Sequence, residues 1–274
     1  MSRSILDLDR LSEVAQRCRP DFESADPFPH IAIDDFLPIE IAESVVAEFD
    51  EGKSAWDHYH HYNQRKLAIT HLDGMGPNNR RLVEALQSDE FVRIVEQITG
   101  LEDLFADPHL DGAGMHKTLP GGHLNMHTDF LSHPKHGDWS RRVNLLIYFN
   151  PGWQEEWMGN LEFWDKDVKN RAQSIAPIFN RGVLFQTSEI SFHGHPHLLT
   201  CPEGTSRNSI ALYYFQKSSE KLDLHPTTYR YTPSDSRAKR WLIGLDTFAV
   251  RLYSMLRRRG GLQDKMLDRI LKYF

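Results

Sequence analysis

The sequence has few cysteines and no long apolar run, and both absences narrow the classes of protein it can belong to. Its 274 residues include only Cys18 and Cys201, which provide neither a disulfide framework nor the spacing of a zinc site. A reducing, cytoplasmic location is therefore expected. No apolar stretch approaches the roughly 20 residues that span a bilayer. The opening MSRSILDLDRLSEVAQ carries acidic residues within its apolar stretch, which argues against a secretory signal.

Positive charge is scarce in most of the chain. The net charge is −6, yet residues 237–274 contain ten Lys or Arg and three Asp, a balance of +7, so the rest carries −13. An acidic body argues against a nucleic-acid partner.

The basic C-terminal stretch has the apolar spacing of an amphipathic helix. We expect this helix to pack on its own domain or in a homodimer interface, with contact to an anionic membrane surface as the alternative. The apolar face would consist of Trp241, Leu245, Phe248, Leu252 and Met255.

The pattern along the chain predicts an N-terminal helix over 1–19, a main domain over 20–217 and a basic helical extension over 218–274. In the main domain, helical periodicity comes first, in PIEIAESVVAEFDE and NNRRLVEALQSDEFVRIVEQITG. Five strand-like runs follow, each bounded by turn residues: HKTLPGGHLNMHTD, RRVNLLIYFN, GNLEFWD, IAPIFNRGVLFQTS and NSIALYYFQK. Helices followed by many short strands predict a β-sandwich or barrel supported by helices.

His127 and Asp129 stand two residues apart in NMHTD, so on a strand their side chains point to the same face. An imidazole and a carboxylate are two of the three ligands in the facial iron(II) sites of non-haem oxygenases. The spacing alone decides nothing, because it also occurs at 71–73 and 109–111.

Further downstream, SFHGHPH offers a third ligand and an arginine follows it. His193, His195 and His197 are equally placed on spacing alone. Arg207 begins the apolar run SIALYYF, and a buried guanidinium there needs an anionic partner. A dicarboxylate would supply one through a bidentate contact.

The order of these motifs resembles the iron(II)/2-oxoglutarate-dependent dioxygenases, in their prolyl-4-hydroxylase-like branch. The likeness covers about residues 100–217 and rests on HTD, RRVNLLIYFN, GNLEFWD, IAPIFNRGVLFQTS, SFHGHP and RNSIALYYF. It implies a mainly β fold, a double-stranded β-helix (jelly-roll, cupin-like) core with flanking helices and the C-terminal helices. Residues 20–217 would then be the dioxygenase domain.

The resemblance also implies roles for single residues. His127, Asp129 and His193 would hold Fe(2+), with His193 as the distal ligand. Arg207 and Tyr148 would bind the distal carboxylate of 2-oxoglutarate. Asn144 stands where relatives often have Thr, and it is a further candidate for cosubstrate binding.

The implied reaction uses 2-oxoglutarate and O2, with ascorbate as a further candidate, and releases succinate and CO2. Hydroxylation of an unactivated C–H bond is expected, with demethylation and desaturation left open. We favour a small polar metabolite or amino-acid-like substrate. The alternatives are a peptidyl-prolyl hydroxylase and a non-redox, cupin-like metal-binding protein. His116, His123 and Trp157 are candidate substrate contacts.

Overall fold

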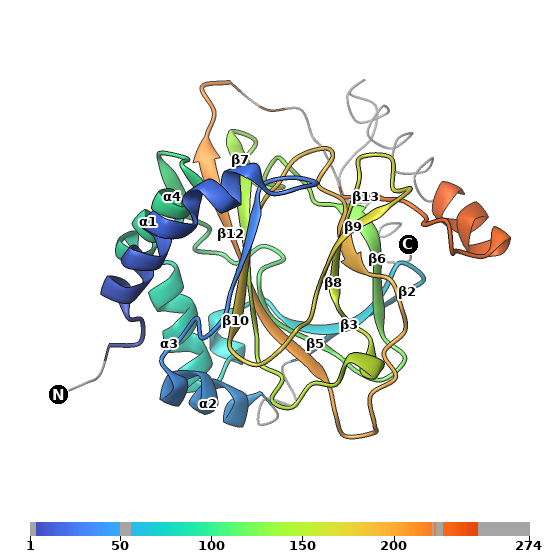
Figure 1. Ribbon diagram of the computed structural model, residues 1–274, viewed down its shortest axis with the longest axis horizontal. Coiled ribbons are helices and arrows are strands. Elements are labelled where there is room, and N and C mark those ends of the chain that lie inside the picture. The colour runs from blue at the N-terminus through green and yellow to red at the C-terminus, as the bar shows by residue number, and fades with distance from the viewer. Residues whose placement is uncertain (1–3, 50–55, 221, 223–226, 246–274) are drawn as a thin grey trace.

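The computed structural model describes residues 4–49, 56–220, 222 and 227–245, and its centre is an antiparallel sheet that curls into a nearly closed barrel (Figure 1). In spatial order the strands are β1 (His30–Ile33), β10 (Arg181–Gln186), β7 (Trp139–Tyr148), β12 (Arg207–Lys217), β5 (Gly114–Thr118), β3 (Gln64–Ile69), β6 (His123–Thr128), β11 (His193–His195), β8 (Leu161–Trp164) and β9 (Arg171–Ile175). Three short strands pair outside this path: β2 (Asp57–His61) with β3, β4 (Leu104–Ala106) with β12, and β13 (Thr228–Tyr229) with β6. The predicted jelly-roll core with flanking helices is confirmed.

Helices cover one outer face of the sheet (Figure 1): α1 (Leu8–Ser24), α2 (Ile39–Glu48), α3 (Pro77–Leu86) and α4 (Asp89–Thr99). Local signals set their ends, as at α4, where the Ser88 side chain accepts a hydrogen bond from the Phe91 amide and Gly100 ends the helix at φ 71°. Helix α1 continues past residue 19 and packs on α4. The predicted domain boundary therefore falls inside a helix that belongs to the main core.

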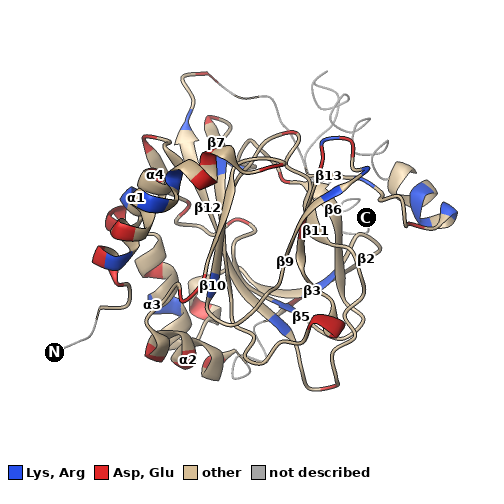
Figure 2. Ribbon diagram, viewed as in Figure 1, with Lys and Arg blue, Asp and Glu red and all other residues tan. Residues whose placement is uncertain are grey.

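The central strand β7 is buried on both faces, and this makes it a rigid wall of the barrel. Val143, Leu145 and Ile147 join the core beneath the helices. Tyr148 points the other way and packs with the aromatic cluster inside the barrel. Each fully buried aliphatic side chain contributes about 1.5–3 kcal/mol. Figure 2 shows charged residues mostly on helices and loops, with a few on the strands of the barrel.

The hairpin of β2 and β3 was not predicted from the sequence, and it shapes the cavity. Strand β3 pairs with β5 through Leu67, Ala68 and Ile69, and with β6 through Gln64 and Arg65. It therefore connects β5 to β6 on one side of the barrel and contributes side chains to the interior.

The C-terminal extension, in its described part, also belongs to the barrel. In strand β13, Tyr229 lies opposite His127 on β6, and a helical segment over 237–245 follows. Of the predicted apolar face, Trp241 and Leu245 are exposed. Phe248, Leu252 and Met255 lie outside the described residues. None of the helices in the described ranges combines the length and apolar character that crossing a bilayer requires.

Candidate active site

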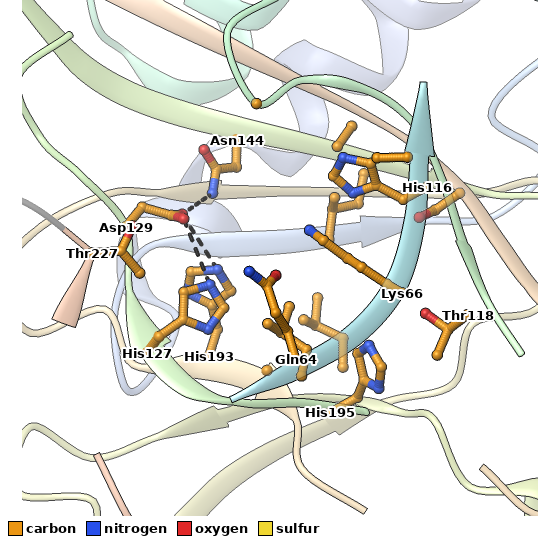
Figure 3. Close-up of a pocket in the computed structure, with 18 of the residues that line it drawn as sticks. Gln64, Lys66, His116, Thr118, His127, Asp129, Asn144, His193, His195 and Thr227 are labelled. Carbon is orange, nitrogen blue, oxygen red and sulfur yellow. Dashed lines mark hydrogen bonds and ion pairs between the residues drawn. The ribbon is translucent and has the colours of Figure 1, made fainter. Parts of the chain in front are cut away.

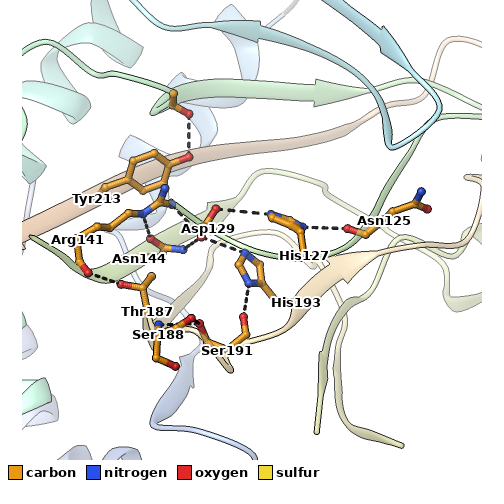
Figure 4. Close-up of polar contacts among 11 residues, drawn as sticks. Asn125, His127, Asp129, Arg141, Asn144, Thr187, Ser188, Ser191, His193 and Tyr213 are labelled. Atoms are coloured by element: carbon orange, nitrogen blue, oxygen red, sulfur yellow. Dashed lines mark hydrogen bonds and ion pairs between the residues drawn. The ribbon is translucent and has the colours of Figure 1, made fainter. Parts of the chain in front are cut away.

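Three side chains that are distant in sequence meet inside the barrel. His193 on β11 lies opposite His127 on β6, with ring centroids 4.4 Å apart, and Asp129 follows β6 directly. The carboxylate oxygens of Asp129 lie 3.6 Å from His127 Nε2 and 3.3 Å from His193 Nε2 (Figure 4). Octahedral metal bonds of about 2.1 Å place neighbouring ligand atoms roughly 3 Å apart. The three groups therefore fit one ion on a single face.

The two imidazoles are held in the tautomer that a metal ligand needs. His127 Nδ1 lies 2.9 Å from the Asn125 carbonyl oxygen, and His193 Nδ1 lies 2.9 Å from that of Ser191. Because a carbonyl only accepts, each Nδ1 carries the proton and each Nε2 keeps its lone pair on the side of Asp129. Burial, and then the nearby His193, lower the pKa of His127, which favours the neutral ring.

Asp129 is positioned by two neighbours from β7. Asn144 Nδ2 donates to Asp129 Oδ2 at 2.7 Å, Arg141 Nη2 lies 3.0 Å from the same oxygen, and Arg141 Nε donates to Asn144 Oδ1. Burial alone would raise the pKa of Asp129, but the Arg141 guanidinium holds it well below its usual range. The carboxylate is therefore ionised and fixed, and in this structure Asn144 contacts the acid expected to bind the metal.

We expect Asn144→Ala to weaken divalent metal binding by about 10- to 100-fold, because outer contacts of this kind orient a ligand. Titration with Mn(II) measures the affinity. Asn160→Ala is the matched control, since the Asn160 amide bonds Ser174 and does not line the cavity. Unchanged Mn(II) affinity in Asn144→Ala would mean that Arg141 positions Asp129 without help.

A second group of cavity residues lies at the end where β7 and β12 meet. Arg207 Nε donates to the Gly159 carbonyl at 2.7 Å, Nη2 lies 3.2 Å from the Tyr148 hydroxyl, and the guanidinium faces the Tyr148 ring at 4.9 Å. Arg207 is buried, which lowers its pKa, and it has no carboxylate partner within the described ranges. The cavity of about 240 Å³ can therefore supply a cationic site for a ligand carboxylate.

A second group of histidine and aspartate side chains, Asp107, Asp111 and His133, resembles a metal site but is arranged differently. His133 Nε2 lies 3.4 Å from Asp107 and 3.2 Å from Asp111. His133 Nδ1, however, receives the backbone N–H groups of Lys135 and His136. The proton must then sit on Nε2, where it is donated to Asp107, so His133 offers no lone pair on that side. This cluster is a buried polar network that holds a loop.

The structure brings some of the predicted substrate contacts to the cavity and leaves others outside. His116 lines it and lies on the same strand as Thr118 (Figure 3). His123 does not line it, because its Nε2 lies 3.0 Å from the Tyr62 carbonyl. Trp157 sits in a short 3-10 helix, packs edge-on against Trp153 and lies outside the cavity. His195 lines the cavity without joining the three grouped ligands, and His197 is near Glu162.

Sequence reasoning missed several residues that line the cavity. Gln64 and Lys66 come from β3, and Thr227 and Tyr229 come from the C-terminal extension (Figure 3). No local signal marks them, because each segment reaches the cavity only through pairing with distant strands.

The barrel and its site define a class of protein, and comparisons with known proteins identify it. Residues 113–215 match the model of the 2OG-Fe(II) oxygenase superfamily. A 97-residue segment is 32% identical to prolyl 3-hydroxylase OGFOD1 of Mus musculus. This match covers 34% of this chain and 17% of that protein. The matched segment is thus a small part of that relative.

Solved structures show the same fold. A prolyl-4-hydroxylase of Pseudomonas putida superposes with a TM-score of 0.54 at 19% identity, covering 74% of this chain and 100% of that chain. A second structure is a prolyl hydroxylase of Trichoplax adhaerens in complex with a hypoxia inducible factor oxygen degradation domain peptide fragment. It superposes with a TM-score of 0.53 at 15% identity, covering 78% of this chain and 94% of that chain.

Residues 113–215 therefore carry the match to the 2OG-Fe(II) oxygenase superfamily, so the predicted resemblance is confirmed, and the prolyl hydroxylases among the similar proteins agree with the predicted branch. The match agrees with the expected enzyme class, a 2-oxoglutarate-dependent dioxygenase that uses Fe(2+), 2-oxoglutarate and O2.

The expected small-molecule substrate is contradicted by the same comparisons. The curated relative is a prolyl 3-hydroxylase, and the Trichoplax adhaerens enzyme was solved with a peptide. The expectation was wrong because the metal and cosubstrate motifs on which it rested contain no information about the substrate.

Proposed function

We propose that this chain is a 2-oxoglutarate-dependent dioxygenase that hydroxylates a prolyl residue in a peptide or protein. The observation that carries the proposal is the convergence of two Nε2 lone pairs and one ionised carboxylate, from His127, His193 and Asp129, in one buried cavity. The identity with a prolyl 3-hydroxylase supports the choice of proline.

In this proposal each side chain has a defined task. His127, Asp129 and His193 bind iron(II), Arg141 and Asn144 orient the aspartate, and Arg207 with Tyr148 binds the distal carboxylate of 2-oxoglutarate. When bound, iron and 2-oxoglutarate supply the oxidation, in which O2 converts the cosubstrate to succinate and CO2 and leaves one oxygen atom in the substrate C–H bond.

The protein itself contributes geometry and protection from water. The metal-side residues His127 and His193 are about 5% exposed, and Phe185 packs against the His193 ring at 4.7 Å. A site this dry strengthens each electrostatic contact and limits oxidation in the absence of substrate. The tight hydrogen bonds around Asp129 also keep the third ligand in place before substrate arrives.

A peptide panel tests the proposal. Blocked peptides that each contain one proline are incubated with the protein, Fe(II), 2-oxoglutarate and O2, beside peptides in which alanine replaces proline. We expect succinate release and a mass gain of one oxygen atom, confined to the proline peptides. Succinate release that is equal for proline and alanine peptides, with no oxygen added to either, would contradict prolyl hydroxylation.

A further inference from the structure

Lys66 is a cation in the cavity that neither the metal site nor the cosubstrate anchor uses. It lies on β3, outside the segment that the superfamily model matches, and points into the cavity beside Gln64 (Figure 3). Its ammonium group faces the Tyr59 ring, 5.8 Å from the centroid, and no carboxylate in the described part of the chain pairs with it.

Strand register separates Lys66 from Arg207. Leu67 lies opposite Lys117 on β5, which places Lys66 beside Thr118, and Thr118 lies opposite Arg207 on β12. Two strand spacings of about 4.8 Å put the Lys66 and Arg207 backbones roughly 10 Å apart on one wall. The side chains also lean in opposite directions, since Arg207 contacts Tyr148 on β7 and Lys66 faces Tyr59 on β2. They are therefore two separate sites for an anion.

The charges in the cavity leave Lys66 without a counterion. The cations that line it are Lys66, Arg141 and Arg207, and the anion is Asp129, which is paired with Arg141. One carboxylate of a bound 2-oxoglutarate would go to Arg207 and the other to the divalent metal. Burial lowers the pKa of Lys66 to about 8, although Asp129 acts in the opposite direction, so the unpaired ammonium is disfavoured.

We propose that Lys66 binds a carboxylate of the substrate, so that the enzyme selects a prolyl residue with an aspartate or glutamate close to it in the peptide. This inference rests on the proposed function, in which the substrate is a peptide. The location fits an incoming chain, because Tyr59 lines the same cavity and is 38% exposed, whereas Arg207 is 6% exposed at the closed end.

The test uses pairs of blocked single-proline peptides that are identical except for aspartate or asparagine beside the proline, on either flank. We expect the wild-type protein to prefer one aspartate peptide by about 10- to 100-fold in kcat/KM, as for a charge-assisted hydrogen bond. Lys66→Met should lose this preference by losing activity on the aspartate peptide, with an unchanged KM for 2-oxoglutarate. Lys66→Arg should retain most of it.

Arg65→Met is the matched control, because Arg65 is the next residue of β3, is exposed and does not line the cavity. It should behave as the wild type. Equal activity on both peptides in the wild type, or a preference that survives in Lys66→Met, would overturn the inference. So would a raised KM for 2-oxoglutarate in Lys66→Met with unchanged peptide selectivity, which would assign Lys66 to the cosubstrate.

Peptide binding to the Mn(II) and 2-oxoglutarate-loaded protein without O2 separates this inference from the proposed function. If the aspartate peptide binds in a Lys66-dependent manner and is not hydroxylated, prolyl hydroxylation fails and the inference stands. If the wild-type protein binds the aspartate peptides no better than the asparagine peptides, the inference fails whatever the reaction is.

Discussion

Replacement of Asp129 by alanine is expected to abolish 2-oxoglutarate-dependent succinate formation, even at saturating iron. The variant removes one of three ligands and leaves the buried Arg141 guanidinium without its carboxylate. Loss of an outer contact alone typically costs 10- to 100-fold in affinity or activity. Loss of the ligand itself should therefore reduce turnover by more than about 100-fold.

Two further variants make this result interpretable. Asp129→Asn keeps a polar group of the same shape beside Arg141, so a loss of turnover with an unchanged melting temperature separates metal binding from folding. Asp73→Ala removes the aspartate of another H-x-D triplet, whose side chain is 92% exposed, and should leave turnover unaffected. Retained turnover in both Asp129 variants would remove Asp129 from the site.

Replacement of Arg207 by alanine should raise the KM for 2-oxoglutarate severely. A buried cation that grips a carboxylate contributes roughly 2–4 kcal/mol, which corresponds to about 30- to 700-fold in the concentration required. The KM of Arg207→Lys should lie between those of the wild type and Arg207→Ala, because an ammonium keeps the charge but loses the planar guanidinium that contacts Tyr148. Succinate formation measured against 2-oxoglutarate concentration gives the values.

Arg181→Ala is the control for loss of an arginine, since Arg181 pairs with Asp34 and does not line the cavity. An unchanged KM for 2-oxoglutarate in Arg207→Ala would mean that another cation is the anchor. Lys66 would then be the next candidate for the anchor. The KM for 2-oxoglutarate of Lys66→Met, measured in the peptide experiment, would test that role.

The choice among the three H-x-D triplets shows how far sequence reasoning reached. The strand-like runs and the histidine behind them favoured the triplet at 127–129, and the structure groups that triplet with His193. The contrast with the triplet at 109–111 depends on hydrogen bonds. Asp111 also faces a buried imidazole, but backbone amides bind His133 Nδ1 and so place the proton on Nε2. That distinction requires atomic positions.

The hairpin of β2 and β3 was beyond sequence reasoning for a related reason. Its residues, DHYHHYNQRKLAI, carry histidine and charge on both faces and lack the apolar alternation that identifies a half-buried strand. Only the pairing of β3 with β5 and β6 turns Lys66 into the cavity and Arg65 out of it. A shift of one residue in this register would exchange them.

The sequence by itself determined what local physics controls. Helix caps set the ends of α4, apolar alternation marked the strands, and the i, i+2 spacing aligned His127 with Asp129. The tertiary structure decided which distant groups share a cavity: His193 beside His127, Arg141 and Asn144 on Asp129, and Lys66 apart from Arg207. The reason is that long-range strand pairing and the direction of each hydrogen bond depend on neighbours that are remote in the chain.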